Sequence, residues 1–132
     1  MANILVVDDD TGIREWLTEI LEGAGHQVFT AQDGLEARPL ANRHSLDVVI
    51  TDISMPNEEG LGMIRTMRKA HPDLKIIALS GKDPEILLDA KLLGAHAVLR
   101  KPVSAKIVLQ SVLDLSPCAP PIKFKNRIRD VS

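Results

Sequence analysis

Four short apolar runs recur along the chain, and a polar residue able to take part in chemistry follows each of them. The runs and the residues that follow are Ile4–Val7 before Asp8 and Asp9, Val48–Thr51 before Asp52, Ile76–Leu79 before Ser80, and Ala97–Arg100 before Lys101. A continuous apolar run between turn residues is typical of a strand buried on both faces, as in a parallel sheet. Parallel sheets bind ligands at the carboxyl ends of their strands. Three carboxylates, a hydroxyl and an ammonium group are therefore expected at one edge of the sheet.

Helical patterns alternate with these runs. Apolar residues at helical spacing, which predict a first amphipathic helix, are Ile13, Trp16, Leu17, Ile20 and Leu21. Asp10 or Thr11 can cap its start, and Gly23 and Gly25 can end it. A short strand is predicted at about 27–31.

The rest of the sequence predicts further helices. Asp33, with Glu36 three positions later, predicts a helix at about 34–44, which Pro39 is expected to shorten or kink. Further helices are predicted at about 59–70, 84–93 and 104–115. Alternating strands and helices predict an α/β fold, (βα)5, with a doubly wound parallel five-stranded sheet.

Length and composition fit one globular domain. The chain has 132 residues, 45% of them hydrophobic and 26% charged, and no apolar run approaches the ~20 residues of a membrane span. No signal peptide is recognised, and a single Cys118 excludes a disulfide framework or a zinc cluster. A cytoplasmic location without membrane contact is expected. The four histidines, which lie at element ends, are expected to be solvated or capping: His26, His44, His71 and His96.

The charge is distributed unevenly around a net value of −2. Residues 117–132, which begin with a Pro-containing segment, carry four basic side chains and one acidic one. They are predicted to be a basic tail, either flexible or a truncated linker, after a domain at 1–116. That domain carries 12 basic and 17 acidic side chains, a balance of −5. An acidic body argues against nucleic-acid binding and suits a cation site.

The residues at the strand ends suggest phosphate chemistry with a metal ion. Asp8, Asp9 and Asp52 offer the hard oxygen ligands that Mg²⁺ prefers, and a cation would relieve their repulsion. Ser80 can donate its hydroxyl to a phosphoryl oxygen, and Lys101 can neutralise a phosphoryl group or pair with Asp52. Taken alone, Ser80 could be a turn residue and Lys101 a surface charge.

The chain resembles the response-regulator receiver domains of bacterial two-component signalling, the CheY-like family. The matching segments, in family order and spacing over about residues 2–115, are ILVVDDD (4–10), VVITDISMPNEEG (48–60), HPDLKIIALSG (71–81) and GAHAVLRKPVS (94–104). The resemblance implies a flavodoxin-like strand order of 2-1-3-4-5. It also implies a domain that accepts a phosphoryl group and switches partner binding.

The same resemblance implies a role for each site residue. Asp52 would be the phosphoacceptor for a phosphohistidine on a sensor histidine kinase or a histidine phosphotransfer protein. Asp9 would bind Mg²⁺, or another divalent cation such as Mn²⁺, directly, Asp8 mainly through water, and Ser54 through its backbone carbonyl. Asp52 itself would complete the metal site.

Two further residues would hold the phosphoryl group itself. Ser80 would bind one phosphoryl oxygen and Lys101 another, with a cis peptide bond between Lys101 and Pro102. Catalysis would consist mainly of positioning and charge neutralisation.

Three positions depart from the family pattern. Val98 stands where the family usually has Tyr or Phe, so the aromatic rotamer switch cannot operate in its usual form. Ser54 and Lys82 occupy the positions that tune phosphoryl lifetime, and neither has a carboxylate or amide to orient an attacking water. A long-lived phosphoryl group is therefore expected.

Three functions could use a fold and a site of this kind. The first is a phosphorylated switch or relay that acts on a downstream protein and could form a homodimer. It would not be an enzyme in the usual sense, because it would catalyse only the gain and the slow loss of its own phosphoryl group. The second is a pseudo-receiver that binds partners without phosphorylation. The third, an aspartyl-phosphate hydrolase of the haloacid dehalogenase type, would need a second Asp where Ser54 stands.

Overall fold

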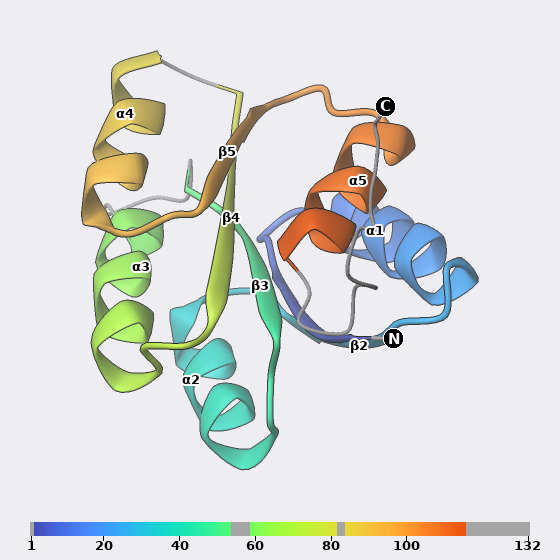
Figure 1. Cartoon of the computed structure of the whole chain (residues 1–132), viewed down its shortest axis with the longest axis horizontal. Coiled ribbons are helices and arrows are strands. Elements are labelled where there is room, and N and C mark those ends of the chain that lie inside the picture. Colours follow the sequence, from blue (N-terminus) through green and yellow to red (C-terminus); the bar gives the residue numbers. More distant parts are fainter. Residues whose placement is uncertain (1, 54–58, 82–83, 116–132) are drawn as a thin grey trace.

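The computed structural model describes residues 2–53, 59–81 and 84–115. In these residues five parallel strands form one sheet in the order β2-β1-β3-β4-β5, with a helix after each strand (Figure 1). The elements are β1 (Asn3–Val7), α1 (Thr11–Gly23), β2 (Gln27–Ala31), α2 (Gly34–Arg43), β3 (Val48–Asp52), α3 (Glu59–Ala70), β4 (Lys75–Ser80), α4 (Pro84–Leu93), β5 (Ala97–Arg100) and α5 (Ala105–Leu115). The predicted doubly wound fold and its strand order are confirmed.

The helices form two layers on the sheet. Figure 1 shows α1 and α5 together on one side, and α2, α3 and α4 on the other. Alternate residues of each strand serve the two layers, since Leu5 and Val7 pack in the core under α2–α4, and Ile4 and Val6 pack under α1 and α5. Continuous apolar runs are needed because both faces of the central strands are covered.

One of the four predicted buried strands is not fully buried. All five residues of β3 are buried, whereas β5 is partly exposed along its length and Arg100 is exposed. The reason is its position at the edge of the sheet, where β4 is its one neighbour among the described strands. An apolar run does not by itself distinguish a central strand from an edge strand.

The helix boundaries lie within one residue of the predicted ones where the sequence signals were strongest. The Asp10 carboxylate caps α1 by accepting from the Ile13 amide at 3.2 Å. Pro39 was expected to shorten or kink α2. The shortening is wrong, because the helix continues to Arg43, and the kink stays a prediction. The His44 amide still bonds to the Leu40 carbonyl at 3.0 Å, so the helical bonding resumes beyond the donor that proline lacks.

Side chains at the amino edge of the sheet hold the starts of strands. His26 Nδ1 accepts from the Ala2 amide at 3.0 Å, and His96 Nδ1 accepts from the Ile76 amide at 3.1 Å. His96 was expected to be solvated or capping, but it is half-buried and bonded to a neighbouring strand.

Among the described residues, none of the helices is both long and apolar enough to cross a lipid bilayer.

Candidate functional site

The carboxyl edge of the sheet brings the predicted site residues to one place. Asp8 follows β1, Asp52 is the last residue of β3, Ser80 is the last residue of β4, and Lys101 follows β5. Asp52 pairs in register with Leu79, so Ser80 lies one residue further along the adjacent strand and is fully buried. Ser54, the predicted carbonyl ligand, lies outside the described residues, and so does Lys82.

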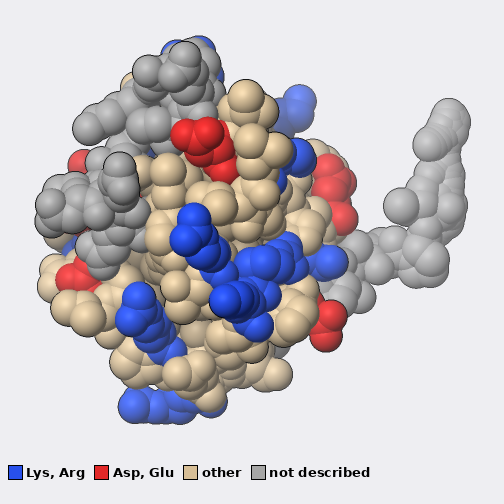
Figure 2. All heavy atoms as spheres, turned by 90° about the vertical axis from the view of Figure 1, so that its left-hand side faces the viewer, with Lys and Arg blue, Asp and Glu red and all other residues tan. Residues whose placement is uncertain are grey.

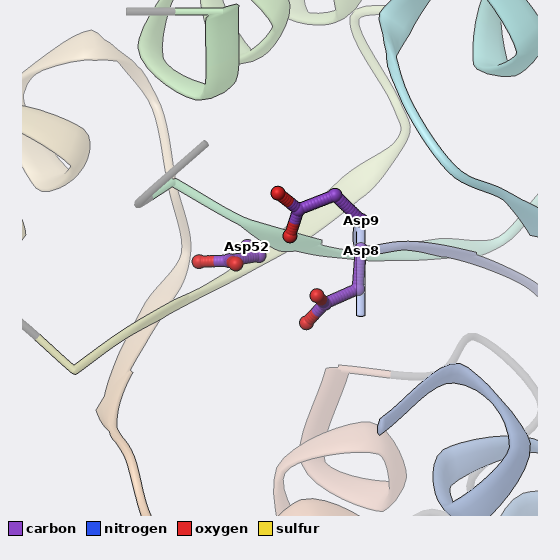
Figure 3. Close-up of side chains that lie close together, drawn as sticks. All are labelled: Asp8, Asp9 and Asp52. Atoms are coloured by element: carbon purple, nitrogen blue, oxygen red, sulfur yellow. The ribbon is translucent and has the colours of Figure 1, made fainter. Parts of the chain in front are cut away.

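Three carboxylates form a compact cluster. One oxygen each from Asp8, Asp9 and Asp52 lies within 4.8 Å of the others (Figure 3). Asp8 and Asp52 are only 1% and 4% exposed, whereas Asp9 is exposed. The cluster therefore has a buried floor and one ligand open to solvent.

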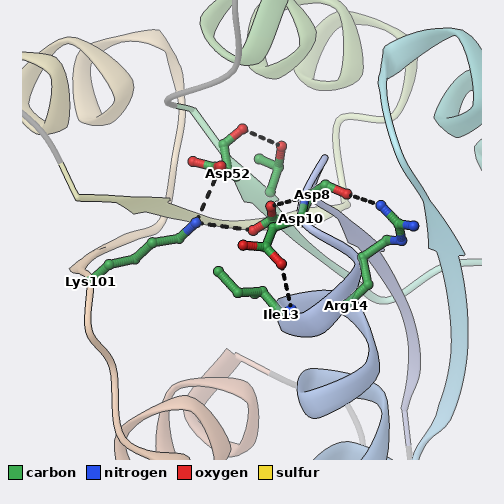
Figure 4. A network of polar contacts seen from close by, with 7 residues as sticks. Asp8, Asp10, Ile13, Arg14, Asp52 and Lys101 are labelled. Carbon is green, nitrogen blue, oxygen red and sulfur yellow. Dashed lines mark hydrogen bonds and ion pairs between the residues drawn. The ribbon is translucent and has the colours of Figure 1, made fainter.

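Lys101 links two of these carboxylates. Its Nζ lies 3.1 Å from Asp8 Oδ2 and 3.2 Å from Asp52 Oδ2 (Figure 4). The Lys101–Pro102 peptide is cis, as the resemblance implied, and the Lys101 amide donates to the Ser80 carbonyl at 2.9 Å. Its side chain is 21% exposed, so Lys101 is a site residue rather than a free surface charge.

Backbone contacts fix Asp8 in place. Its amide donates to the Ala31 carbonyl at 3.1 Å, and its Oδ1 accepts from the Asp10 amide at 2.9 Å. The Arg14 guanidinium donates to the Asp8 carbonyl, as Figure 4 shows. Sequence reasoning missed Arg14, whose partner is a backbone carbonyl that no side-chain pattern reveals. Asp10 serves as the helix cap, in agreement with its expected structural role.

The charges of the site are not balanced within the described residues. Burial, reinforced by the negative charge of Asp52, raises the pKa of the Asp8 carboxyl, although the Asp10 amide and Lys101 oppose this. Burial alone would lower the pKa of the Lys101 ammonium, but Asp52 and Asp8 outweigh it and raise that pKa. Lys101 therefore stays protonated. Three carboxylates against one ammonium leave an excess of negative charge that a divalent cation would complement.

The fold and the acidic edge define a class of doubly wound α/β domains with a ligand site at the carboxyl ends of the strands. Within this class, the family model for the response regulator receiver domain matches residues 4–113. The chain therefore belongs to the response regulator receiver family of two-component systems. Receiver domains of response regulators are phosphoacceptors.

Individual relatives agree with this assignment. The DNA-binding transcriptional regulator NtrC of Azospirillum brasilense is 38% identical over 112 residues, which cover 84% of this chain and 23% of that protein. Response regulator MprA of Mycobacterium sp. (strain KMS) is 39% identical over 109 residues, covering 82% of this chain and 47% of that protein. This chain thus spans less than half the length of these curated relatives.

Solved structures show the same fold. The chemotaxis protein CheY4 of Vibrio cholerae superimposes with a TM-score of 0.81 at 32% identity, covering 87% of this chain and 98% of that one. A receiver domain protein from Clostridium thermocellum gives the same TM-score at 35% identity, covering 87% of this chain and 94% of that one.

Proposed function

We propose that this receiver domain accepts a phosphoryl group on Asp52 from a phosphohistidine of a sensor histidine kinase or a histidine phosphotransfer protein. The observation that carries the proposal is the convergence of Asp8, Asp9, Asp52 and Lys101 at one edge of the sheet. A nucleophilic carboxylate, two further carboxylates and an ammonium group are the parts that phosphoryl transfer requires.

The transfer needs no co-reactant beyond the phosphohistidine. A carboxylate oxygen of Asp52 attacks phosphorus and the P–N bond breaks. The electron pair stays on the imidazole nitrogen, so a ring that carries a proton on its other nitrogen leaves as neutral imidazole. Lys101, already 3.2 Å from Asp52 Oδ2, would turn its ammonium toward a phosphoryl oxygen as charge develops there. The Ser80 hydroxyl would donate to a second oxygen.

The donor set fits a hard divalent cation. Oxygen ligands at two buried and one exposed carboxylate, with excess negative charge, suit Mg²⁺ or Mn²⁺. Asp8, Asp9, Asp52 and the Ser54 carbonyl would hold the ion. When bound, the cation neutralises negative charge on the phosphoryl oxygens.

Asp52 phosphorylation is tested with acetyl phosphate and Mg²⁺, followed by intact mass measurement. The wild-type chain should gain the mass of one phosphoryl group, and Asp52→Asn should gain none. Asp47→Asn, a matched change just before the other end of β3, should be labelled like the wild type. No adduct on the wild type, or an adduct that survives Asp52→Asn, would favour a pseudo-receiver.

The phosphoryl group is expected to be long-lived. Neither Ser54 nor Lys82 offers a carboxylate or amide that could orient a water for attack on phosphorus. The measurement is loss of the adduct after removal of acetyl phosphate, and loss within seconds would contradict this expectation. Replacing Lys82 by Glu should shorten the lifetime, with Lys106→Glu on α5 as the control.

The receiver domain at 1–116 would switch the binding of a downstream protein, with the basic segment 117–132 as a tail or linker. Relatives named as transcriptional regulators, such as NtrC, raise the question of nucleic acid. The absence of direct nucleic-acid contact stays a prediction for this chain, as do homodimer formation and a cytoplasmic location. An electrophoretic shift with unrelated DNA at physiological salt would contradict the first of these.

A further inference from the structure

A surface groove lies between α3 and α4, on the helical layer opposite α1 and α5. Its volume is about 450 Å³, and it is lined by Leu61, Gly62, Arg65, Asp89, Leu92 and Leu93. It belongs to neither the carboxylate cluster nor the contacts of Lys101. Gly62 lies in this lining, and a β-carbon at that position would point into open space.

The groove is bordered by leucines that are exposed or only partly buried. Leu92 is 76% exposed and Leu88, one turn earlier on α4, is 61% exposed. Leu61 and Leu93 contact the core only at its margin and are partly buried. Adjacent exposed leucines at helical spacing form an apolar strip, which is typical of a protein-binding surface rather than of scattered surface residues.

The α3 side of this strip is basic. Helix α3 carries three basic side chains and one acidic one, whereas α4 carries one basic and two acidic ones. Along the whole sequence, residues 61–116 carry nine basic and five acidic side chains, and residues 1–60 carry three basic and twelve acidic ones. Figure 2 shows Lys and Arg side chains gathered over the middle of the face that carries α3 and α4, with surface from other residue types between them. Asp89 is the single acidic residue among the six that line the groove.

The basic side chains near the groove differ in whether the fold already uses them. Arg68 donates to the Gly94 carbonyl at 3.0 Å, and Lys91 donates to the His96 carbonyl at 3.0 Å, so these two side chains stabilise the fold. Arg65 and Lys69 are exposed on one side of α3, and within the described part of the chain no hydrogen bond or ion pair engages either side chain.

We propose that the groove between α3 and α4 binds an amphipathic helix of a protein partner, with apolar side chains against Leu88 and Leu92 and acidic side chains facing Arg65 and Lys69. A helix laid into a groove buries such a strip and places its flanking charges beside the rim. Opposite charges at the rim supply specificity and speed of association. This inference does not depend on phosphorylation of Asp52.

Two other occupants fit less well. The chain's own segment 117–132 is basic, so Arg65 and Lys69 would repel it. The acidic face of α1 on a second copy, with Glu15, Glu19 and Glu22, has the right charge. The residues that line the hollow on that face are charged residues and threonines, however, with no apolar side chain among them to cover the leucines.

The test uses the full chain and a labelled synthetic helix with leucines along one face and glutamates on both flanks. Fluorescence anisotropy gives the affinity, and amide shifts in NMR spectra locate the contact. Leu92→Ser and Arg65→Glu should each weaken binding about tenfold, a loss typical of residues central to an interface. Matched controls on α5, Leu113→Ser and Lys106→Glu, should leave it unchanged, since Leu113 is 47% exposed and Lys106 is exposed.

The controls separate the occupants. A peptide with lysine in place of each glutamate should bind more weakly, and added salt should reduce the difference between the two peptides. Equal binding of both peptides, amide shifts outside α3 and α4, or no effect of the two groove substitutions would overturn the proposal. Self-association of the chain that Arg65→Glu abolishes, without peptide binding, would overturn it in favour of a second copy.

Discussion

The two edges of the sheet, at the amino and the carboxyl ends of the strands, differ in how their polar side chains are paired. At the amino edge, side-chain acceptors are each matched to one backbone amide, as the Asp47 carboxylate is to the Asn3 amide at 2.8 Å. At the carboxyl edge, Asp8 and Asp52 are buried together, and within the described residues both form an ion pair with the ammonium group of Lys101. The amino edge is satisfied by the chain itself, whereas the carboxyl edge is left with negative charge.

This difference separates groups that stabilise the fold from groups that can react. A buried donor–acceptor pair contributes to stability when both partners are present. Buried like charges destabilise the native state unless a counter-ion is bound. The receiver therefore holds a reactive edge at a cost in stability, which the rest of the sheet offsets.

The largest expected effect is at Lys101. Lys101→Met should lower the free energy of unfolding by about 2 kcal/mol without divalent cation, because the buried carboxylates of Asp8 and Asp52 would both lose their ion pair with Lys101. Partial exposure of Lys101 keeps the loss below that of a fully buried pair. Urea unfolding monitored by circular dichroism measures it. Lys106→Met, on the exposed side of α5, should change the value by less than about 0.5 kcal/mol; equal effects of both changes would contradict the comparison.

A matched pair of substitutions at the two ends of β3 should differ in sign. Without divalent cation, Asp52→Asn should raise the free energy of unfolding by about 1 kcal/mol, because it removes one of three crowded negative charges. Asp47→Asn should lower it by up to about 1 kcal/mol, since it replaces a charged acceptor of the Asn3 amide by a neutral one. The same urea experiment measures both, and a loss of stability in Asp52→Asn would show that the ion pair with Lys101 outweighs the repulsion between the carboxylates.

The smallest expected effect is a loss of stability at acidic pH that arises from His96. Burial, aided by the positive charges of Arg68, Lys75 and Lys91, lowers the pKa of His96 below its ordinary value of 6.5. As pH falls, this histidine is therefore protonated in the unfolded chain before it is protonated in the folded one. The free energy of unfolding should decrease below about pH 6.5, by under about 1 kcal/mol for this residue.

A substitution isolates that contribution. His96→Asn keeps an acceptor for the Ile76 amide but does not titrate. Urea unfolding between pH 7.5 and 5.5 should show a shallower loss for this variant than for the wild type. Burial also lowers the pKa of His26, so His26→Asn should flatten the curve in the same direction. Identical pH dependence in all three proteins would exclude both histidines as its source.

The convergence of the site residues could be predicted from the sequence because each lies at the end of a strand or just after it. Asp52 and Ser80 are the last residues of β3 and β4, and the parallel direction of the two strands places both at the same edge of the sheet. Helix starts followed from local chemistry, as in the cap that Asp10 gives to α1. Such signals involve residues close together in the sequence, so they can be recognised in a single sequence.

The missed features depend on contacts between distant residues. The role of His96 arises from the Ile76 amide, twenty residues away on the neighbouring strand. The incomplete burial of β5 follows from strand order, and its apolar sequence resembles that of central strands. The groove at Leu92 arises where two helices meet, and periodicity within either helix does not show it.

The uneven charge along the chain also affects how the molecule meets its partners. The acidic first half supplies β1, β2 and β3, and the more basic remainder supplies β4 and β5 at the opposite side of the sheet. Such a separation gives the protein an electric dipole moment across its strands. A partner's field would exert a torque on that dipole and turn the molecule before contact, so that encounters begin in a preferred orientation and slow as salt rises.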